Sequence, residues 1–384
     1  MFTGIIKGMI PKEWIPYTLP LKDVRIADQI IRKGLGYING DQLLLNAEKL
    51  YAAKQDYLDP ITLQAVLLMY RQLDAYLIQN PLLDLDIYLN LDEQYCTFEP
   101  SKRRGLYEIA TSYQVFLERE GKVDENDLAR LFLQKITQEQ VKPFDFVVAD
   151  EIQDLTEIQI YTLIRLARNP NHLLFSGDIN QTIRPTYFHM GRIESILKTS
   201  NAHLKFRKYP LTRNYRSPRE VVDLANQIID LRIERLGLNK SNDYYEAPVR
   251  GRHSDVFFCD FQSSKDLANL LETGLNRHYV AIVVPDEIHM EQLKHFTNTE
   301  GAVFTVEEIK GIEKDYIIGY NVMSKYMDIW ETILHEDVAH DSKYRYYFNL
   351  LYVAVTRARQ QLCLIEEAMP PSLMNKLADH FVVG

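Results

Sequence analysis

The chain has 384 residues, of which 46% are hydrophobic and 25% charged, and its formal net charge is −9. This length allows two or three domains with their own cores, and the composition is that of a folded globular protein rather than a disordered or fibrous one. The acidic balance argues against a uniformly basic nucleic-acid coat, so phosphate contacts would come from local patches. The densest patch lies within residues 205–219, and a smaller one at residues 102–104 is equally explained as solvated surface charge.

Membrane insertion, disulfide frameworks and zinc sites find no support in the sequence. No stretch approaches the roughly 20 apolar residues of a membrane-spanning helix, and the first residues lack the apolar core of a signal peptide. Cys96, Cys259 and Cys363 are widely separated and form no CxxC pattern. We therefore expect a cytoplasmic protein with free thiols and no membrane partner.

The apolar pattern changes about one third of the way along the chain. From about residue 24 to residue 140, apolar side chains recur at three- and four-residue spacing, which predicts a mostly helical region. After residue 143, short apolar runs ending in acidic or small residues alternate with helical segments, which predicts an α/β fold with a parallel sheet. The predicted strands lie within 144–150, 172–178, 254–261, 279–286, 315–322 and 361–366. The predicted helices lie within 157–168, 217–236, 264–277 and 346–359.

Two acid-bearing segments follow predicted strands. Asp150 and Glu151 come directly after the run Phe146–Ala149, in the DEIQD segment (Asp150–Asp154). Because ligands of open parallel sheets bind at the carboxyl ends of the strands, Asp150 could hold Mg²⁺ through water and Glu151 could activate a water molecule. A solvated acidic turn is the alternative. The next strand ends in the GDINQ segment (Gly177–Gln181), where a glycine allows a tight turn and an amide side chain could contact a terminal phosphate.

Arginine-bearing segments follow later in the chain. In the NYRS segment (Asn214–Ser217), an arginine could bind phosphate and a tyrosine could stack on a base, while Ser217 and Pro218 fit an N-cap and the first helical position. The KGIE segment (Lys310–Glu313) precedes a predicted strand. Arg357, in the TRAR segment (Thr356–Arg359), could stabilise charge on a transferring phosphoryl group, or simply interact with a helix dipole.

In identity, order and approximate spacing, these segments resemble the motifs of the UvrD/Rep family of superfamily 1 helicases. DEIQD resembles motif II, GDINQ motif III, NYRS motif IV, the KGIE segment motif V and LLYVAVTRAR motif VI. The resemblance runs from about residue 105 to 367. It implies RecA-like motor domains, the first of them incomplete, preceded by a helical region. The implied divisions are 1–140 (helical, like the family's helical insert), 141–208 (partial first motor domain) and 209–384 (second motor domain without a large accessory insert).

The resemblance also implies ATP and Mg²⁺ as cofactors and assigns roles to matching positions. Asp150 would bind the metal, Glu151 would activate water, Gln181 would sense the terminal phosphate, and Asp178 belongs with the cofactor-binding residues. After residue 209, Arg216 would also sense the terminal phosphate, Tyr215 would stack on adenine and Arg357 would be the arginine finger. Glu313 would contact the ribose, and Gly311 would shape the turn before it.

DNA, single-stranded by preference, is the implied partner. Tyr187 or Phe188 would replace a base-stacking residue of the family, and Thr305 and Lys310 match positions near its DNA contacts. Glu307 stands where the family usually has histidine, a departure that would weaken a DNA or phosphate contact.

The family's phosphate-binding loop, the Walker A pattern GxxxxGK[ST], does not occur in this sequence. Of the 16 glycines only Gly121 is followed by lysine, and Val123 comes next. That loop supplies a backbone nest, a lysine and a hydroxyl for phosphate and Mg²⁺. Two hypotheses follow. The first is an incomplete ATP-dependent helicase or translocase whose loop is missing or supplied by another chain. The second is a non-hydrolysing DNA- or partner-binding regulatory protein built on the same scaffold.

Overall fold

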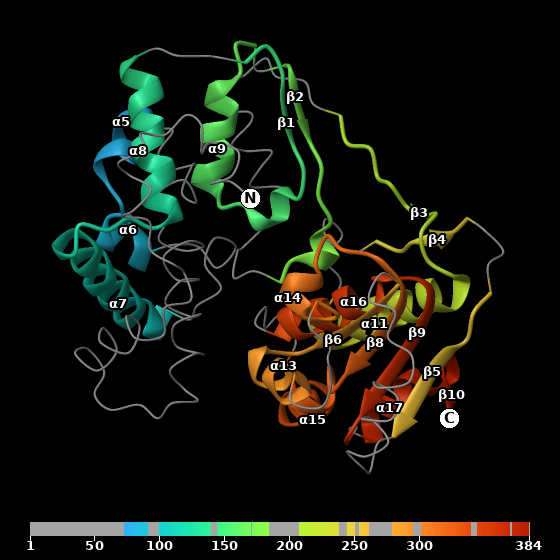
Figure 1. Cartoon of the computed structure of the whole chain (residues 1–384). Coiled ribbons are helices and arrows are strands. Elements are labelled where there is room, and N and C mark those ends of the chain that lie inside the picture. Colours follow the sequence, from blue (N-terminus) through green and yellow to red (C-terminus); the bar gives the residue numbers. More distant parts are fainter. Residues whose placement is uncertain are drawn as a thin grey trace. The chain divides into compact units, whose positions relative to one another are not determined.

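The computed structural model divides into two compact units, with the boundary between Lys208 and Tyr209 (Figure 1). It describes residues 73–90, 100–139, 144–169, 171–183, 207–237, 244–249, 253–260, 279–294, 301–338, 344–368 and 371–383. Each unit is considered by itself. Within these ranges no helix is both long enough and apolar enough to cross a membrane.

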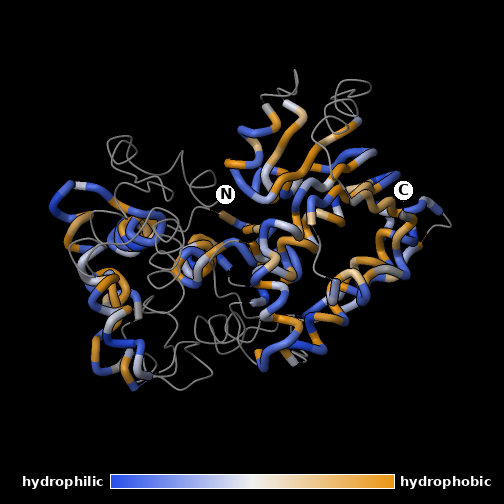
Figure 2. The backbone as a smooth tube through the Cα atoms, turned by 90° about the horizontal axis from the view of Figure 1, so that it is seen from below, coloured by the Kyte–Doolittle hydropathy of each residue, from blue (hydrophilic) through white to orange (hydrophobic). Residues whose placement is uncertain are grey.

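Helices predominate in the described part of unit 1 that precedes its strands, as predicted. Their bounds are α5 (Leu73–Gln79), α6 (Leu85–Leu89), α7 (Pro100–Arg119) and α8 (Glu125–Gln138). Helix α8 begins where it does because the Asp124 carboxylate accepts a hydrogen bond from the Asp127 N–H at 2.9 Å. Orange and blue alternate along the helices in Figure 2, as expected for elements with one apolar side.

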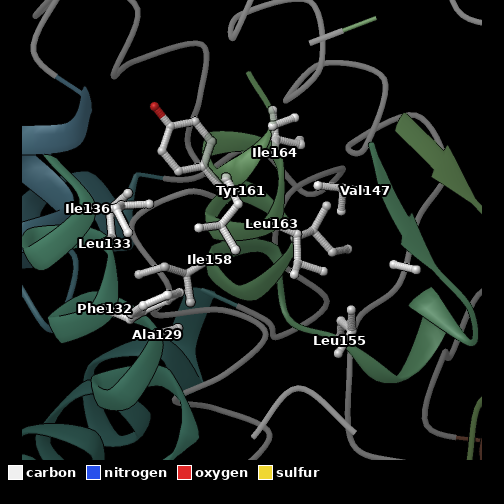
Figure 3. Close-up of a cluster of buried hydrophobic side chains, with 14 of the residues drawn as sticks. Ala129, Phe132, Leu133, Ile136, Val147, Leu155, Ile158, Tyr161, Leu163 and Ile164 are labelled. Carbon is white, nitrogen blue, oxygen red and sulfur yellow. The ribbon is translucent and has the colours of Figure 1, made fainter. Parts of the chain in front are cut away.

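The core of unit 1 lies between two helices and a short parallel sheet. Strands β1 (Val147–Ala149) and β2 (Leu173–Phe175) pair in parallel, and α9 (Glu157–Leu166) lies between them in sequence. Apolar side chains of α8 face those of α9, with Phe132 and Leu133 near Ile158 (Figure 3). This core fixes the sheet, and with it the segments that leave the ends of β1 and β2.

One face of this two-stranded sheet is exposed. Alternate residues of β1 are buried in the core, whereas Phe146, Val148 and Leu174 have exposed fractions of 69%, 66% and 61%. His172 stacks on the Phe146 ring at 4.4 Å between centroids. Because parallel sheets are normally covered on both faces, this face is an unusual feature of the described structure.

Unit 2 is built on a six-stranded parallel sheet with the order β10-β5-β9-β8-β6-β7. The bounds are β5 (Val256–Asp260), β6 (Val280–Val284), β7 (Val303–Thr305), β8 (Lys314–Tyr320), β9 (Ala358–Glu366) and β10 (Val382–Val383). A separate parallel pair consists of β3 (Arg213–Asn214) and β4 (Ala247–Pro248). The predicted α/β class and parallel pairing are confirmed.

Helices α11 (Arg219–Leu236) and α16 (Arg345–Val355) pack against each other and against β9 and β8 respectively. The remaining described helices of unit 2 are α13 (Glu287–Lys294), α14 (Val306–Ile309), α15 (Met327–His335) and α17 (Pro371–Leu377). Short 3-10 helices occur in both units. They are η6 (Ile152–Asp154) and η7 (Ile179–Gln181) in unit 1, and η8 (Ser324–Tyr326) and η10 (Ala378–His380) in unit 2. The helix predicted within 264–277 lies outside the described residues.

Two predicted helix ends were wrong by one or more residues. Helix α11 begins at Arg219 with Pro218 as its N-cap, and Ser217 makes no side-chain cap. The Asn214 side chain instead shapes the turn before the helix, because its oxygen accepts the N–H groups of Arg216 and Ser217 at 2.8 Å each. Helix α16 ends at Val355, so Arg357 lies in the turn between α16 and β9 rather than within a helix.

Candidate functional site

The DEIQD and GDINQ segments meet at the ends of β1 and β2. Because these strands are parallel neighbours, the residues that follow them lie side by side. The Ser176 hydroxyl donates to Asp150 Oδ1 at 2.6 Å, and the Glu151 N–H donates to the same oxygen at 2.9 Å. Asp150 is exposed. Its carboxylate is therefore held from one side and presented to solvent on the other.

Glu151 adopts the left-handed conformation, with φ of 54°, which is uncommon for a residue with a side chain. Its carboxylate accepts a hydrogen bond from the Gln153 amide. Gln153 is completely buried, and its oxygen accepts the Asp178 N–H at 3.0 Å. One buried amide thus links the acid of the first segment to the backbone of the second.

The GDINQ segment forms a tight turn around Asp178. Its two carboxylate oxygens accept hydrogen bonds from the Asn180 N–H at 2.9 Å and from Gln181 Nε2 at 2.7 Å. Gly177 is required here because an added Cβ would collide with the Gln153 side-chain oxygen. The four predicted site residues of unit 1, Asp150, Glu151, Asp178 and Gln181, therefore belong to one connected polar cluster.

Three further segments meet within unit 2. Arg216 Nη2 lies 2.6 Å from Glu313 Oε1, and Arg216 Nη1 lies 3.5 Å from the Thr356 carbonyl oxygen. The NYRS, KGIE and TRAR segments are thus joined by one guanidinium. Both side chains of the ion pair are 35% exposed, so the pair is accessible to solvent.

Glu313 and Arg357 directly precede the neighbouring strands β8 and β9. Lys314, the first residue of β8, pairs with Ala358, the first of β9, and its N–H donates to the Arg357 carbonyl oxygen at 3.3 Å. Gly311, with φ of 79°, allows the turn that leads into β8. The residues around Arg216 in unit 2 therefore lie at the amino edge of their sheet. The polar cluster of unit 1 lies at the carboxyl edge of its own sheet.

Arg357 is folded back onto the end of its helix. Its side chain is 2% exposed, with Nε donating to the Val353 carbonyl oxygen at 3.1 Å and Nη2 contacting Thr356 Oγ1 at 3.0 Å. In this rotamer the guanidinium satisfies the Val353 carbonyl oxygen at the C-terminus of α16. Contact with a phosphate would require it to exchange those partners.

The remaining predicted residues differ in what the structure gives them. Tyr215 is 60% exposed beside Arg216. Thr305 is buried as the N-cap of α14, where it forms a capping box with Glu308, so its hydroxyl already has a structural partner. Lys310 is half-buried at the end of α14. Tyr187 and Phe188 lie outside the described residues.

Sequence reasoning missed Gln153 and Ser176, which hold the carboxylates of unit 1. Gln153 lies inside the DEIQD segment, and its position there was the only available signal. Ser176 comes after β2 at the position where Asp150 comes after β1, so the strand pairing could have suggested it. The structural role of Asn214 also escaped notice, because its side chain acts on the backbone.

The Asp150 site fits Mg²⁺ held largely by water and phosphate oxygens. Among the described residues there is no cluster of three His, Cys, Asp or Glu side chains placed to bind a metal. Asp150 offers one exposed carboxylate beside a hydroxyl, and Mg²⁺ commonly uses one or two carboxylates and retains several waters. For ATP, Arg216 offers a half-exposed cation and Tyr215 an exposed ring, but the sequence contains no GxxxxGK[ST] cradle. Each unit, considered by itself, therefore fits only part of a nucleoside triphosphate.

Comparisons with known proteins found a family model and several relatives that match parts of this chain. Residues 42–203 match the family model described as the UvrD/REP helicase N-terminal domain. The human TPR and ankyrin repeat-containing protein 1 is 25% identical over 262 residues, 62% of this chain and 9% of that protein. A probable DNA helicase II homolog of Mycoplasma capricolum is 33% identical over 30% of this chain and 17% of that protein. ATP-dependent DNA helicase PcrA of Leuconostoc citreum is 26% identical over 42% of this chain and 23% of that protein.

Solved structures give weaker likenesses. The match to the PRRSV helicase structure covers 59% of this chain and 35% of the helicase chain, at 12% identity and a TM-score of 0.33. The C-terminal domain of a possible DNA helicase from Lactobacillus plantarum covers 44% of this chain and 98% of that chain, at 17% identity and a TM-score of 0.28. This chain spans less than a quarter of the length of the three curated relatives above. The family-model match and the helicase relatives show that parts of this chain are similar to UvrD/REP helicases.

Proposed function

We propose that the chain is part of a UvrD-like, ATP-dependent DNA helicase or translocase. The observation that carries this proposal is the cluster around Arg216, which joins three sequence segments through Glu313 and the Thr356 carbonyl oxygen. A guanidinium held between a carboxylate and a backbone oxygen, and still half exposed, is suited to exchange one partner for a phosphate. The helicase relatives support the same class of protein.

The residues of unit 1 would handle the metal and the attacking water. Asp150 would hold Mg²⁺ through water, and a bound Mg²⁺ would neutralise charge on the phosphates. Glu151, fixed by Gln153, would orient a water molecule and accept its proton. Gln181, held by Asp178, would respond to the terminal phosphate through its amide.

The residues of unit 2 would bind the nucleotide and stabilise developing charge. Arg216 would contact the terminal phosphate, Glu313 the ribose, and the exposed Tyr215 ring would stack on adenine. Arg357 would act as the arginine finger after releasing the Val353 carbonyl oxygen. Gly311 keeps the backbone of this turn in the conformation that places Glu313.

Two further elements complete the proposal. We infer that the phosphate-binding loop is missing or is supplied by another polypeptide, because no GxxxxGK[ST] pattern occurs in this sequence. We propose that the protein binds single-stranded DNA and moves along it. Tyr187 or Phe188 would stack on bases, and Thr305 and Lys310 would lie near the strand.

The test is DNA-stimulated ATP hydrolysis by the purified chain, alone and mixed with a polypeptide that carries GxxxxGK[ST]. Hydrolysis that is lost in Glu151→Gln and retained in Glu139→Gln would support the motor. Glu139 is a suitable control because its carboxylate is half exposed and pairs with Lys135, one helical turn away. Absence of nucleotide binding under both conditions would reject the proposal.

A regulatory protein that binds DNA or a partner without hydrolysis is the second candidate. Three observations favour this candidate. The sequence lacks the phosphate-binding loop, the Arg216 guanidinium is already paired with Glu313, and Arg357 is buried. This candidate predicts binding to single-stranded DNA, measured by fluorescence anisotropy, with an affinity that ATP does not change. An affinity that responds to ATP would favour the motor instead.

A further inference from the structure

Glu246 connects two of the segments described above, although it belongs to neither. It lies directly before β4. Its two carboxylate oxygens have different partners. Oε2 accepts a hydrogen bond from Asn214 Nδ2, and Oε1 accepts one from the Tyr352 hydroxyl at 2.8 Å.

The position of Glu246 is itself fixed on both sides of its backbone. Its N–H donates to Asn226 Oδ1 at 3.0 Å, and its carbonyl oxygen accepts from Asn226 Nδ2 at 2.8 Å. The following residue, Ala247, pairs with Arg213 in the β3–β4 ladder. Because Asn226 belongs to the long helix α11, the backbone of Glu246 is anchored to that helix.

On one side, Glu246 determines which way the Asn214 amide points. Since Nδ2 donates to Glu246, the Asn214 oxygen must face the other way, where it accepts the N–H groups of Arg216 and Ser217. Those two bonds shape the turn from which the Arg216 side chain extends to Glu313. Without the carboxylate, the amide would be free to rotate and the turn would lose its acceptor.

On the other side, Glu246 holds the last turn of α16. Tyr352 is completely buried, and its hydroxyl ends at the carboxylate. Its carbonyl oxygen accepts both the Thr356 N–H at 3.1 Å and the Thr356 hydroxyl at 2.8 Å. Thr356 in turn supplies the carbonyl oxygen for Arg216 and a hydroxyl for Arg357.

We propose that Glu246 is a positioning residue that sets Arg216 and the Thr356–Arg357 turn in register with each other. The proposal rests on the function proposed above. A carboxylate suits this place because both neighbours are donors and it is acceptor-only, whereas a glutamine amide has one acceptor oxygen and would turn its NH₂ toward a donor. Such charge-assisted bonds are also the stronger kind.

The experiment compares Glu246→Ala and Glu246→Gln with a matched control, Glu367→Ala. Glu367 also accepts a tyrosine hydroxyl, that of Tyr320 at 2.7 Å, so the control removes the same type of bond elsewhere in unit 2. Hydrogen–deuterium exchange of the full chain is measured by mass spectrometry. We expect peptides covering 212–217 and 352–357 to exchange about tenfold faster in Glu246→Ala, since a hydrogen bond to a charged group is lost on each side. Peptides of β6 should be unchanged, and Glu246→Gln should give an intermediate effect.

A second measurement separates positioning from general stability. In DNA-stimulated ATP hydrolysis with the loop-bearing polypeptide, Glu246→Ala should lower kcat about tenfold with little change in KM. Combined with Arg216→Ala it should cause no further loss. If Glu246→Ala does not fold, Tyr352→Phe tests the α16 side alone. Unchanged exchange at both peptides, or a uniform increase that includes β6, would overturn the proposal. Absence of hydrolysis in the wild type would reject the proposed function and leave the exchange result to decide on Glu246.

Discussion

Arg216 Nη2 lies 2.6 Å from Glu313 Oε1, an ion pair between two sequence segments that were each expected to contact nucleotide. The pair satisfies the arginine while no phosphate is present. A phosphate that binds Arg216 must therefore compete with Glu313, and the guanidinium has a second partner in the Thr356 carbonyl oxygen to keep its orientation during the exchange.

Replacing Arg216 should affect activity far more than stability. Since both members of the pair are 35% exposed, Arg216→Ala should lower the free energy of unfolding by less than about 1 kcal/mol. Hydrolysis should fall by about 10³-fold, as expected when an arginine that stabilises phosphoryl charge is lost. Chemical denaturation and a steady-state ATPase assay measure the two quantities. Arg359→Ala is the control. Arg359 lies in β9, its Nε is 3.9 Å from Asp315 Oδ1 in β8, and it has no proposed role in hydrolysis. Equal losses of activity in both variants would contradict the assignment.

Gly177→Ala should destabilise unit 1 through one specific collision. The new Cβ would meet the Gln153 side-chain oxygen and approach Ile152 Cγ1 to 3.2 Å. Since Gln153 is buried and bonded to Glu151 and Asp178, it can yield only by giving up those bonds, and we expect a cost of about 1 to 3 kcal/mol. Urea unfolding followed by circular dichroism measures it.

A double variant tests the cause of that cost. Gln153→Ala removes the colliding atom, so Gln153→Ala with Gly177→Ala should be less destabilised than the sum of the single variants. Strict additivity would mean that the collision is relieved in another way.

The sequence predicted six of the described strands and their parallel pairing, because short apolar runs that end in acids reflect burial and sheet topology directly, but it did not predict the short strands β3, β4, β7 and β10. The convergence of Asp150 with the GDINQ segment also follows from topology alone, since neighbouring parallel strands end at one edge. What it could not supply was the connectivity of the side chains. Gln153, Asn214 and Glu246 act through hydrogen bonds to partners distant in sequence or to backbone groups, and no local pattern reports such bonds.

The end of α16 illustrates the same limit. The run LLYVAVTRAR is helical by pattern, and apolar spacing continues smoothly through Ala358. The structure ends the helix at Val355 because Ala358 begins β9, which pairs with both β8 and β5. Tertiary pairing overrides local propensity here, and as a result Arg357 is buried in a turn.

Thr305 allows a test of its structural role as the N-cap of α14, which is separate from its proposed position near DNA. Its hydroxyl accepts the Glu308 N–H at 3.2 Å, and Glu308 accepts the Thr305 N–H at 3.0 Å. Thr305→Ala should therefore cost about 1 kcal/mol of unfolding free energy, while Thr305→Ser should cost much less because it keeps the hydroxyl. Thermal unfolding followed by calorimetry distinguishes the two. Equal midpoints for alanine and serine would show that the cap contributes nothing.

Glu366 predicts how the stability of unit 2 changes with pH. The carboxyl group is completely buried at the end of β9, and burial raises its pKa to about 7, although the N–H groups of Met323 and Ser324 and the Ser324 hydroxyl act in the opposite direction. The folded state therefore binds this proton more tightly than the unfolded state does. The corresponding stability is fully present below the ordinary pKa of 4.5 and is lost as pH rises toward 7. The loss should be on the order of 3 kcal/mol.

Urea denaturation between pH 4 and pH 8 would measure this dependence, and Glu366→Gln should flatten it, because the amide does not titrate. The variant should also be less stable than the wild type at low pH, since its NH₂ group would face one of the backbone donors at Met323 and Ser324. Glu336→Gln serves as the control, because Glu336 is exposed and should leave the slope unchanged. A wild-type slope that persists in Glu366→Gln would assign the pH dependence to another group and would remove Glu366 as its source.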